Sequence, residues 1–147
     1  MITHPQEFHG LVAALVPFTR FMLQNHGAFL PMGAVVRSGD VVMVPGGSRV
    51  PYATVQEWLQ ILREELRTHA ADPACDAVAY CVDVKLTDTR DGAVMSAVQI
   101  VFEHRSGEAL DAFFPYEPTG DGYEYRQPML RISARSIFEE PSSAYLH

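Results

Sequence analysis

Three acidic residues, Asp83, Glu103 and Asp111, fall in three consecutive predicted strands, and we predict that they share one face of a sheet. Gln99 and His104 lie in the middle strand of the three. Carboxylates gathered on a partly apolar surface can serve acid/base chemistry or bind a cation. These five residues are therefore the candidate binding site. A solvated sheet face with basic counter-charges explains the same pattern, because the expected register keeps the carboxylates apart.

Other nucleophile and metal patterns are poorly supported. Cys81 and His104 could form a nucleophile and base, but the approximate hairpin register places Cys81 nearer Gln99 than His104, and the two groups must meet at hydrogen-bond distance. A buried, inert cysteine is the favoured interpretation of Cys81. No two histidines have the i, i+4 helical spacing that suits a metal, and no Cys-x-x-Cys occurs. We therefore expect no catalytic residue, no metal and no cofactor.

A loop reading Pro-Gly-Gly-Ser-Arg at residues 45–49 precedes the second predicted helix. Its backbone amides and Arg49 could hold an anion near the helix N-terminus. It lacks the lysine and spacing of a phosphate-binding P-loop, so a plain connection is the favoured interpretation.

The bulk composition restricts the class of protein. The 147 residues are 48% hydrophobic and 20% charged, with a formal net charge of −7. Nucleic-acid binding requires a basic patch to neutralise phosphates, and anionic membrane surfaces attract basic segments, so neither partner is expected. The N-terminus lacks the basic region and apolar core of a signal peptide, and its longest apolar run is too short to span a bilayer. The expected location is the cytoplasm.

Hydrophobic periodicity predicts two helices and five strands. Residues from Thr3 or His4 to Gly27 form a helical stripe that keeps its phase across Pro17, which favours one kinked helix over two. A Thr-x-x-Glu capping box at Thr54 begins the second helix, which runs to about Ala70 with Arg63 among its water-facing residues. The strands are expected at about 28–36, 41–44, 77–86, 93–104 and 108–115.

The order of these elements predicts a single α+β domain over residues 1–147, in which two helices pack on a five-stranded, mainly antiparallel sheet. Residues 117–147 are expected to form an irregular C-terminal extension, with short elements possible near 123–126 and 129–137. The second helix covers one face of the sheet. The other, mixed face carries Asp83, Gln99, Glu103 and Asp111, with His104 as a further candidate for the same site. The first helix could cover part of this face or leave it open.

An aromatic cluster lies near the C-terminal end of the last predicted strand. Phe113, Tyr116, Tyr123 and Tyr125 could form an exposed edge that binds a partner. The prolines beside them suit an edge strand, where a missing N–H does no harm. The alternative is that Phe114 fills the core and the tyrosines cover it.

The element order resembles that of the roadblock and longin domains and, more loosely, profilin. Residues 27–34 and 103–116 resemble segments of small bacterial proteins to which no activity is attached. The roadblock resemblance implies a homodimer formed through the second helix and the third predicted strand. The resemblance to the small bacterial proteins carries over no catalytic residue.

The favoured function is a small cytoplasmic interaction domain, non-enzymatic and self-associating, whose partner is a second copy or another protein. A small-molecule binding protein or modest enzyme, with a pocket between the first helix and the mixed sheet face, is the main alternative. An immunity or inhibitor protein would suit the acidity and small size.

Overall fold

A computed structural model describes residues 2–46, 54–134 and 136–138. Along the chain the elements are α1 (Pro5–His26), β1 (Met32–Arg37), β2 (Asp40–Val44), α2 (Val55–Ala70), β3 (Cys75–Thr87), β4 (Val94–His104), β5 (Ala109–Pro118), β6 (Tyr123–Tyr125) and β7 (Met129–Ile132). The predicted α+β class and antiparallel pairing are confirmed. The predicted count of five strands is too low, because β6 and β7 extend the sheet. Of the proposed anion loop at residues 45–49, only the first two residues are described. The rest of that loop and the chain from Glu139 onward lie outside the described residues.

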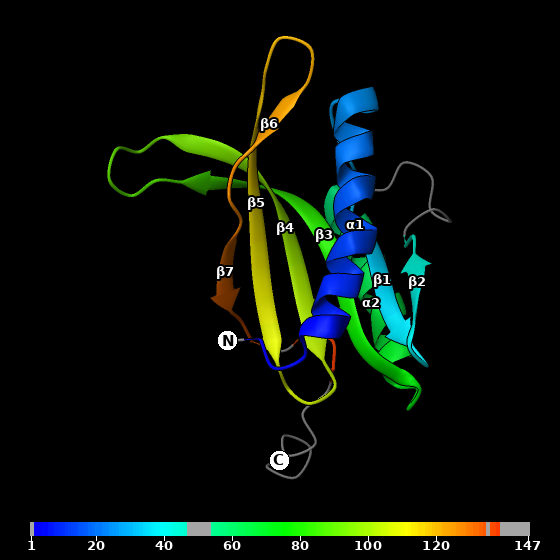
Figure 1. The fold of residues 1–147 in the computed structure, drawn as a ribbon. Helices are drawn as coiled ribbons and strands as arrows, with labels where there is room; N and C mark the ends of the chain where they lie inside the picture. Colours follow the sequence, from blue (N-terminus) through cyan, green and yellow to red (C-terminus); the bar gives the residue numbers. More distant parts are fainter. Residues whose placement is uncertain (1, 47–53, 135, 139–147) are drawn as a thin grey trace.

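The strands follow the order β2-β1-β3-β4-β5-β6, and β7 pairs with β5 beside β6 (Figure 1). The prediction that the strand around Phe113 lies at an edge is therefore wrong. β5 pairs with β4 on one side and with β6 and β7 on the other. At the opposite end of the described sheet, β2 pairs with β1 alone.

The helix α1 is continuous through Pro17, so the alternative of two separate helices is wrong. Pro5 occupies the first turn, where its missing N–H costs nothing. Gly27 ends the helix with a φ of 71°, and its N–H donates to the carbonyl of Leu23. The buried side chains recur every three or four residues: Phe8, Leu11, Leu15, Thr19 and Leu23. Neither helix of the described residues has the length and apolar character that a bilayer span requires.

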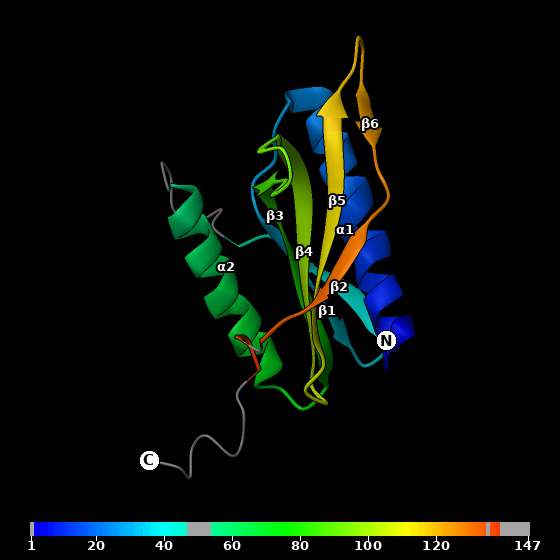
Figure 2. The same cartoon turned by 90° about the vertical axis from the view of Figure 1, so that its left-hand side faces the viewer.

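The helix α2 begins with the predicted capping box, in which Thr54 and Glu57 bond reciprocally. Leu62, Leu66 and Ala70 are its buried residues. The helix approaches β1 closely because Gly33 has no side chain; a Cβ there would lie 2.9 Å from Leu62 Cδ1. Figure 2 shows that α1 and α2 lie on opposite faces of the sheet.

Two hydrophobic clusters hold these layers together. The cluster under α1 includes Ala79, Ile100, Phe102 and Leu110, and the cluster under α2 includes Val35, Val78 and Tyr80 among its sheet residues. Because successive side chains of a strand point to opposite faces, β1, β3 and β4 contribute side chains to both clusters. The face under α1 is the more uniformly apolar, and the mixed face lies under α2.

Candidate functional site

The five predicted site residues do not lie together. Asp83 pairs with Val98 and faces α1, whereas Gln99, Glu103 and Asp111 face α2. His104 lies on the α1 face, because it pairs with Ala77. The prediction that Asp83, Gln99, Glu103 and Asp111 share one face under the first helix is therefore wrong, and each of the five residues needs its own account.

Asp83 is exposed and accepts a hydrogen bond of 2.8 Å from the Tyr116 hydroxyl. Burial, together with this carboxylate, raises the pKa of Tyr116. The hydroxyl therefore stays protonated and donates to Asp83. The contact joins β3 to β5 across the intervening strand, which is a structural role.

The Glu103 carboxylate is buried and bound by other parts of the protein, so it is not available to a ligand. Its side chain is 1% exposed, and its carboxylate accepts hydrogen bonds from the backbone N–H groups of Ser136, Ile137 and Phe138 and from the Ser136 hydroxyl, at 2.9–3.1 Å. Ile137 and Phe138 are buried against α2. We call this arrangement the Glu103 clasp. It fixes residues 136–138 across the mixed face of the sheet, and backbone donors satisfy the buried charge.

Asp111 is also buried and paired. Its Oδ2 accepts a hydrogen bond of 2.7 Å from Arg131 Nη2 on the neighbouring strand β7. The Arg131 guanidinium also lies over the Phe113 ring, 5.1 Å from its centroid. The Asp111 charge is thus neutralised, and one of the predicted aromatic edge residues is covered.

A cavity of about 270 Å³ opens on the mixed face beside Asp111 and Gln99. Its floor comes from β3, β4 and β5, one wall from Leu59 and Arg63 of α2, and the other from Ser133, Ala134 and Ser136. The sequence placed Arg63 on the water-facing side of its helix, and that prediction is wrong. Arg63 Nε and Nη2 donate to the Tyr80 hydroxyl at 3.1 and 2.8 Å. We call this space the α2 cavity.

Polar groups in the α2 cavity remain available. Ser133 Oγ is buried and has no hydrogen-bond partner. Gln99 lines the cavity too, and none of the contacts among the described residues engages its amide. Burial raises the pKa of Tyr80, against the opposing effect of Arg63, so its hydroxyl is neutral at physiological pH. Of these lining residues, only Gln99 and Asp111 were candidates from the sequence.

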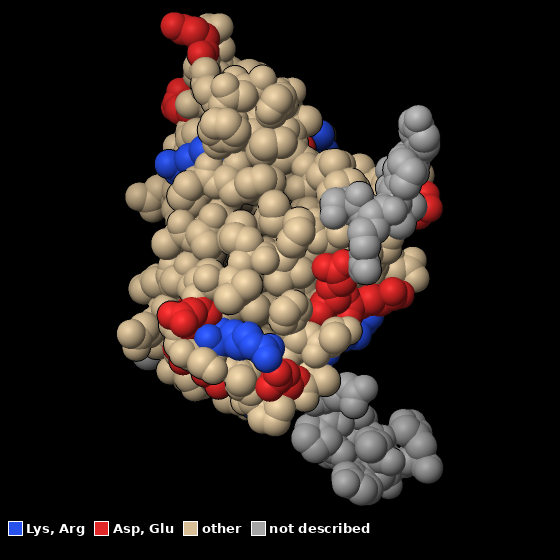
Figure 3. Space-filling model, turned by 90° about the vertical axis from the view of Figure 1, so that its right-hand side faces the viewer, with Lys and Arg blue, Asp and Glu red and all other residues tan. Residues whose placement is uncertain are grey.

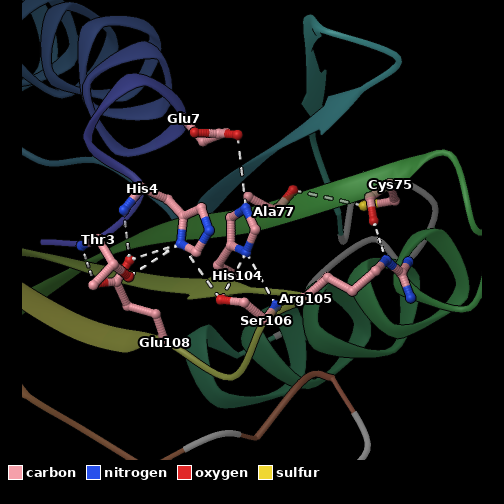
Figure 4. A network of polar contacts seen from close by, with 9 residues as sticks. All are labelled: Thr3, His4, Glu7, Cys75, Ala77, His104, Arg105, Ser106 and Glu108. Carbon is pink, nitrogen blue, oxygen red and sulfur yellow. Dashed lines mark hydrogen bonds and ion pairs between the residues drawn. The ribbon is translucent and has the colours of Figure 1, made fainter.

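A second polar network surrounds the N-terminus of α1 (Figure 4). The rings of His4 and His104 stack with centroids 3.5 Å apart and planes 9° from parallel. Glu108 accepts hydrogen bonds from the backbone N–H groups of Thr3 and His4, at 2.7 and 3.2 Å. A carboxylate from the β4–β5 turn thus satisfies N–H groups at the start of α1, where the His4 side chain provides no cap.

The protonation of His104 follows from its neighbours. Its Nδ1 accepts from the Ser106 backbone N–H at 3.0 Å, which leaves the proton of the neutral ring on Nε2. Nε2 faces Glu7 Oε1 at 3.7 Å. Burial lowers the pKa of His104, and the stacked His4 lowers it further, against the opposing effect of Glu7. The ring is therefore neutral at physiological pH.

We expect the free energy of unfolding to fall between pH 7.5 and 5.5, because the unfolded chain takes up a proton on His104 more readily than the folded one. For a depressed histidine pKa, the stabilisation is complete above about pH 6.5 and is lost as the pH falls below that value. His104→Gln should flatten this dependence in urea titrations at the two pH values, whereas the exposed control His26→Gln should not. Equal pH dependence in wild type and His104→Gln would refute this account of the cluster.

The cysteines are unsuited to nucleophilic chemistry. Cys75 and Cys81 are both buried. Burial raises the pKa of the Cys81 thiol to about 12. Cys81 pairs with Ile100, one position from the predicted partner, and His104 lies four residue pairs further along the two strands, opposite Ala77. No group of three His, Cys, Asp or Glu side chains in the described residues is arranged to hold a metal ion.

The aromatic cluster mainly covers the core. Phe113 and Tyr116 are buried, and Tyr123 and Tyr125 are half-buried. The Tyr116 and Tyr123 rings meet edge to face at 5.7 Å, and Arg20 of α1 lies over the Tyr125 ring at 4.2 Å. This placement fits the interpretation in which the aromatic side chains fill and cover the core, rather than the one in which they form an exposed edge. Its role in binding a partner stays a prediction.

The β2 edge of the sheet carries an exposed apolar surface that the sequence did not indicate as a site. Val41 and Met43 of β2 are about 40% exposed, and Phe21 of α1 is 60% exposed. A Cβ added to Gly10 of α1 would lie 3.5 Å from Val41, so the helix flank and the strand form one surface. We call it the α1/β2 surface. A signal for it does exist, because Arg20 is the only Lys, Arg, Asp or Glu between Phe8 and Val36.

Comparisons with protein-family models, with curated protein sequences and with solved structures find no match to this chain.

Proposed function

We propose that this protein is an interaction domain that forms a homodimer through the α1/β2 surface. The observation that carries the proposal is the edge strand β2, which exposes apolar side chains beside an almost uncharged helix flank. Edge strands that do not self-associate are commonly protected by charges, prolines or bulges. In β2 only Asp40, at its first position, is charged.

The shape and charge of this surface suit a second copy of the same chain. Figure 3 views the molecule from the side of β2, and the centre of this face carries no Lys, Arg, Asp or Glu side chain. Antiparallel pairing of β2 with its own copy about a two-fold axis at Val42 would set Asp40 opposite Val44. This register brings no like charges together, and a symmetric pairing closes on itself.

A hollow beside the same surface offers room for an anchoring side chain. It measures about 330 Å³, and its lining includes Gly10, Val36 and Val41 with Glu7 and Asp76. Apolar pockets with a polar rim are typical positions for the residues that dominate an interface. The helix α1 is about 33 Å long, and β2 contributes five residues. One helix flank and one short strand make an interface smaller than the standard about 800 Å² per partner, so we expect dissociation in the micromolar range.

The roadblock resemblance implied dimerisation through helix 2 and strand 3. Both edges of β3 are occupied, by β1 and β4, so that strand offers no free edge. We therefore place the interface of the proposed dimer at β2 instead. The resemblance to roadblock domains therefore supports self-association in this proposal, but it does not supply the position of the interface.

The test is to introduce one charge at the centre of the surface. Val41→Glu should weaken dimerisation by at least roughly 100-fold, because the dimer would bury an unpaired carboxylate. Light scattering coupled to gel filtration measures the mass of each variant, and circular dichroism confirms that it is folded. Val94→Glu is the matched control, since Val94 is 64% exposed on the distant β3–β4 hairpin.

A second exposed apolar edge provides the rival surface. Met129, Leu130 and Ile132 of β7 are 50–80% exposed. The proposal predicts that Ile132→Glu remains dimeric. A dimer that survives Val41→Glu and is dissociated by Ile132→Glu would move the interface to β7 and would overturn the assignment to β2.

A further inference from the structure

We propose that the α2 cavity is a binding site for a small organic acid, whose single carboxylate is held by Arg63. This site is independent of the proposed dimer surface, because α2 and α1 cover opposite faces of the sheet (Figure 2). At about 270 Å³ the cavity is close to the lower end of the usual range for small-molecule sites, roughly 300–1,000 Å³.

Arg63 supplies the charge that an acid requires. Among the described residues it has no carboxylate partner. Its contacts there are two hydrogen bonds to the Tyr80 hydroxyl and the approach of its guanidinium carbon to 5.5 Å from the centroid of the Tyr80 ring. Asp111, which lines the same cavity, is already neutralised by Arg131. A guanidinium has five N–H donors in a planar fork, so donors remain for a carboxylate after the bonds to Tyr80.

The other lining residues indicate the chemistry of the part of the ligand that lies beyond its carboxylate. Leu59, Val82 and Val101 provide apolar contact beside the guanidinium. The buried Ser133 Oγ and the Gln99 amide provide hydrogen-bonding groups that have no partner among the described residues. A buried hydroxyl without a partner is costly, and a ligand that reaches it recovers that cost. The lining therefore suits a compact apolar acid with a second polar group away from its carboxylate.

The charges favour one carboxylate over a phosphate. Asp111 shares the cavity, and Glu103 lies on the same face two positions along β4 from Val101. With Asp111 paired to Arg131, Arg63 supplies one positive charge, which balances a monoanion and leaves one negative charge of a dianion unpaired beside these carboxylates. Tyr80 and Asp111 occupy one cross-strand row with Val101 between them, so strand spacing places them about 10 Å apart. A single aromatic or short aliphatic acid fits this span.

The experiment uses 4-hydroxybenzoate as the probe, the neutral 4-hydroxybenzamide as its matched analogue, and inorganic phosphate as the alternative anion. Titration calorimetry on the full chain should give saturable 4-hydroxybenzoate binding with a Kd of about 1 mM or tighter. Amide shifts in nitrogen–proton NMR spectra should map to β3, β4 and α2. The benzamide and phosphate should bind at least roughly tenfold more weakly.

Two variants locate the probe. Arg63→Gln should weaken 4-hydroxybenzoate binding by roughly tenfold or more, while Arg90→Gln, which removes an equal charge from the exposed β3–β4 turn, should leave it unchanged. Val82→Phe should block binding by filling the cavity while Arg63 stays in place. Equal binding of the acid and the amide, unchanged binding in Arg63→Gln or Val82→Phe, tighter binding of phosphate, or no saturable binding would each overturn the proposal.

Discussion

Glu103→Ala should lower the free energy of unfolding by about 3–4 kcal/mol, because the variant leaves the donors of the Glu103 clasp buried without an acceptor. The carboxylate is 1% exposed and accepts hydrogen bonds from three backbone N–H groups and one hydroxyl. Hydrogen bonds to a charged acceptor are the stronger kind, and losing one partner costs more than the net value of the bond. Urea unfolding followed by circular dichroism measures the change.

The clasp also predicts where the structure loosens. In Glu103→Ala the amides of Ser136, Ile137 and Phe138 should exchange with solvent far faster than in the wild type, and this region should become sensitive to protease. Glu103→Gln keeps the shape and one acceptor oxygen, so its loss should be smaller. Glu64→Ala on the exposed face of α2 is the control and should change stability by less than about 0.5 kcal/mol. Unchanged stability and amide protection in Glu103→Ala would show that the clasp does not hold this segment.

Phe102→Ala should lower the free energy of unfolding by about 3–5 kcal/mol. Phe102 is among the largest fully buried side chains, and its ring meets that of Phe8 edge to face at 5.3 Å between α1 and the sheet. Removing the ring leaves a cavity at the centre of the α1 layer. For a domain of this size the melting temperature should fall by about 10 °C, which differential scanning calorimetry records.

Phe21→Ala is the matched variant, because the chemical change is the same but Phe21 is 60% exposed on the α1/β2 surface. It should leave the stability of the monomer within about 0.5 kcal/mol of the wild type. It should instead weaken the dimer. A loss of monomer stability in Phe21→Ala as large as that in Phe102→Ala would contradict the division between core and interface.

Hydrophobic periodicity was sufficient to predict both helices and the five longer strands, since each has a clear apolar pattern and turn residues at its ends. The two strands it did not secure, β6 and β7, contain three and four residues and are held by pairing with β5. Strands this short carry too few positions to show alternation, so their existence depends on contacts that local sequence does not contain.

The predicted site grouped the wrong residues because the register between strands also depends on contacts that local sequence does not contain. The approximate register set Cys81 near Gln99, but Cys81 pairs with Ile100. A shift of one residue moves every side chain of a strand to the other face. Asp83 was consequently grouped with Glu103 and Asp111, although it lies on the opposite side of the sheet.

The Glu103 clasp and the α2 cavity were beyond prediction because they join distant parts of the chain. The acceptors of Glu103 contact backbone groups 33–35 residues away, and such donors have no side-chain signature. Arg63 occupies a helix position that looks solvent-exposed by periodicity alone. Its direction is set by the Tyr80 hydroxyl on β3. The α1/β2 surface was different, since the scarcity of charge from Phe8 to Val36 was visible in the sequence.

Self-association through the α1/β2 surface is the central claim, and sedimentation velocity of the wild type beside Val41→Glu and Val94→Glu tests it most directly. Over a concentration series that brackets the micromolar range, the wild type and Val94→Glu should shift from the 16.3 kDa monomer to twice that mass, whereas Val41→Glu should remain a folded monomer throughout. A wild type that stays monomeric over the whole series, or a Val41→Glu dimer as stable as that of the wild type, would contradict the claim.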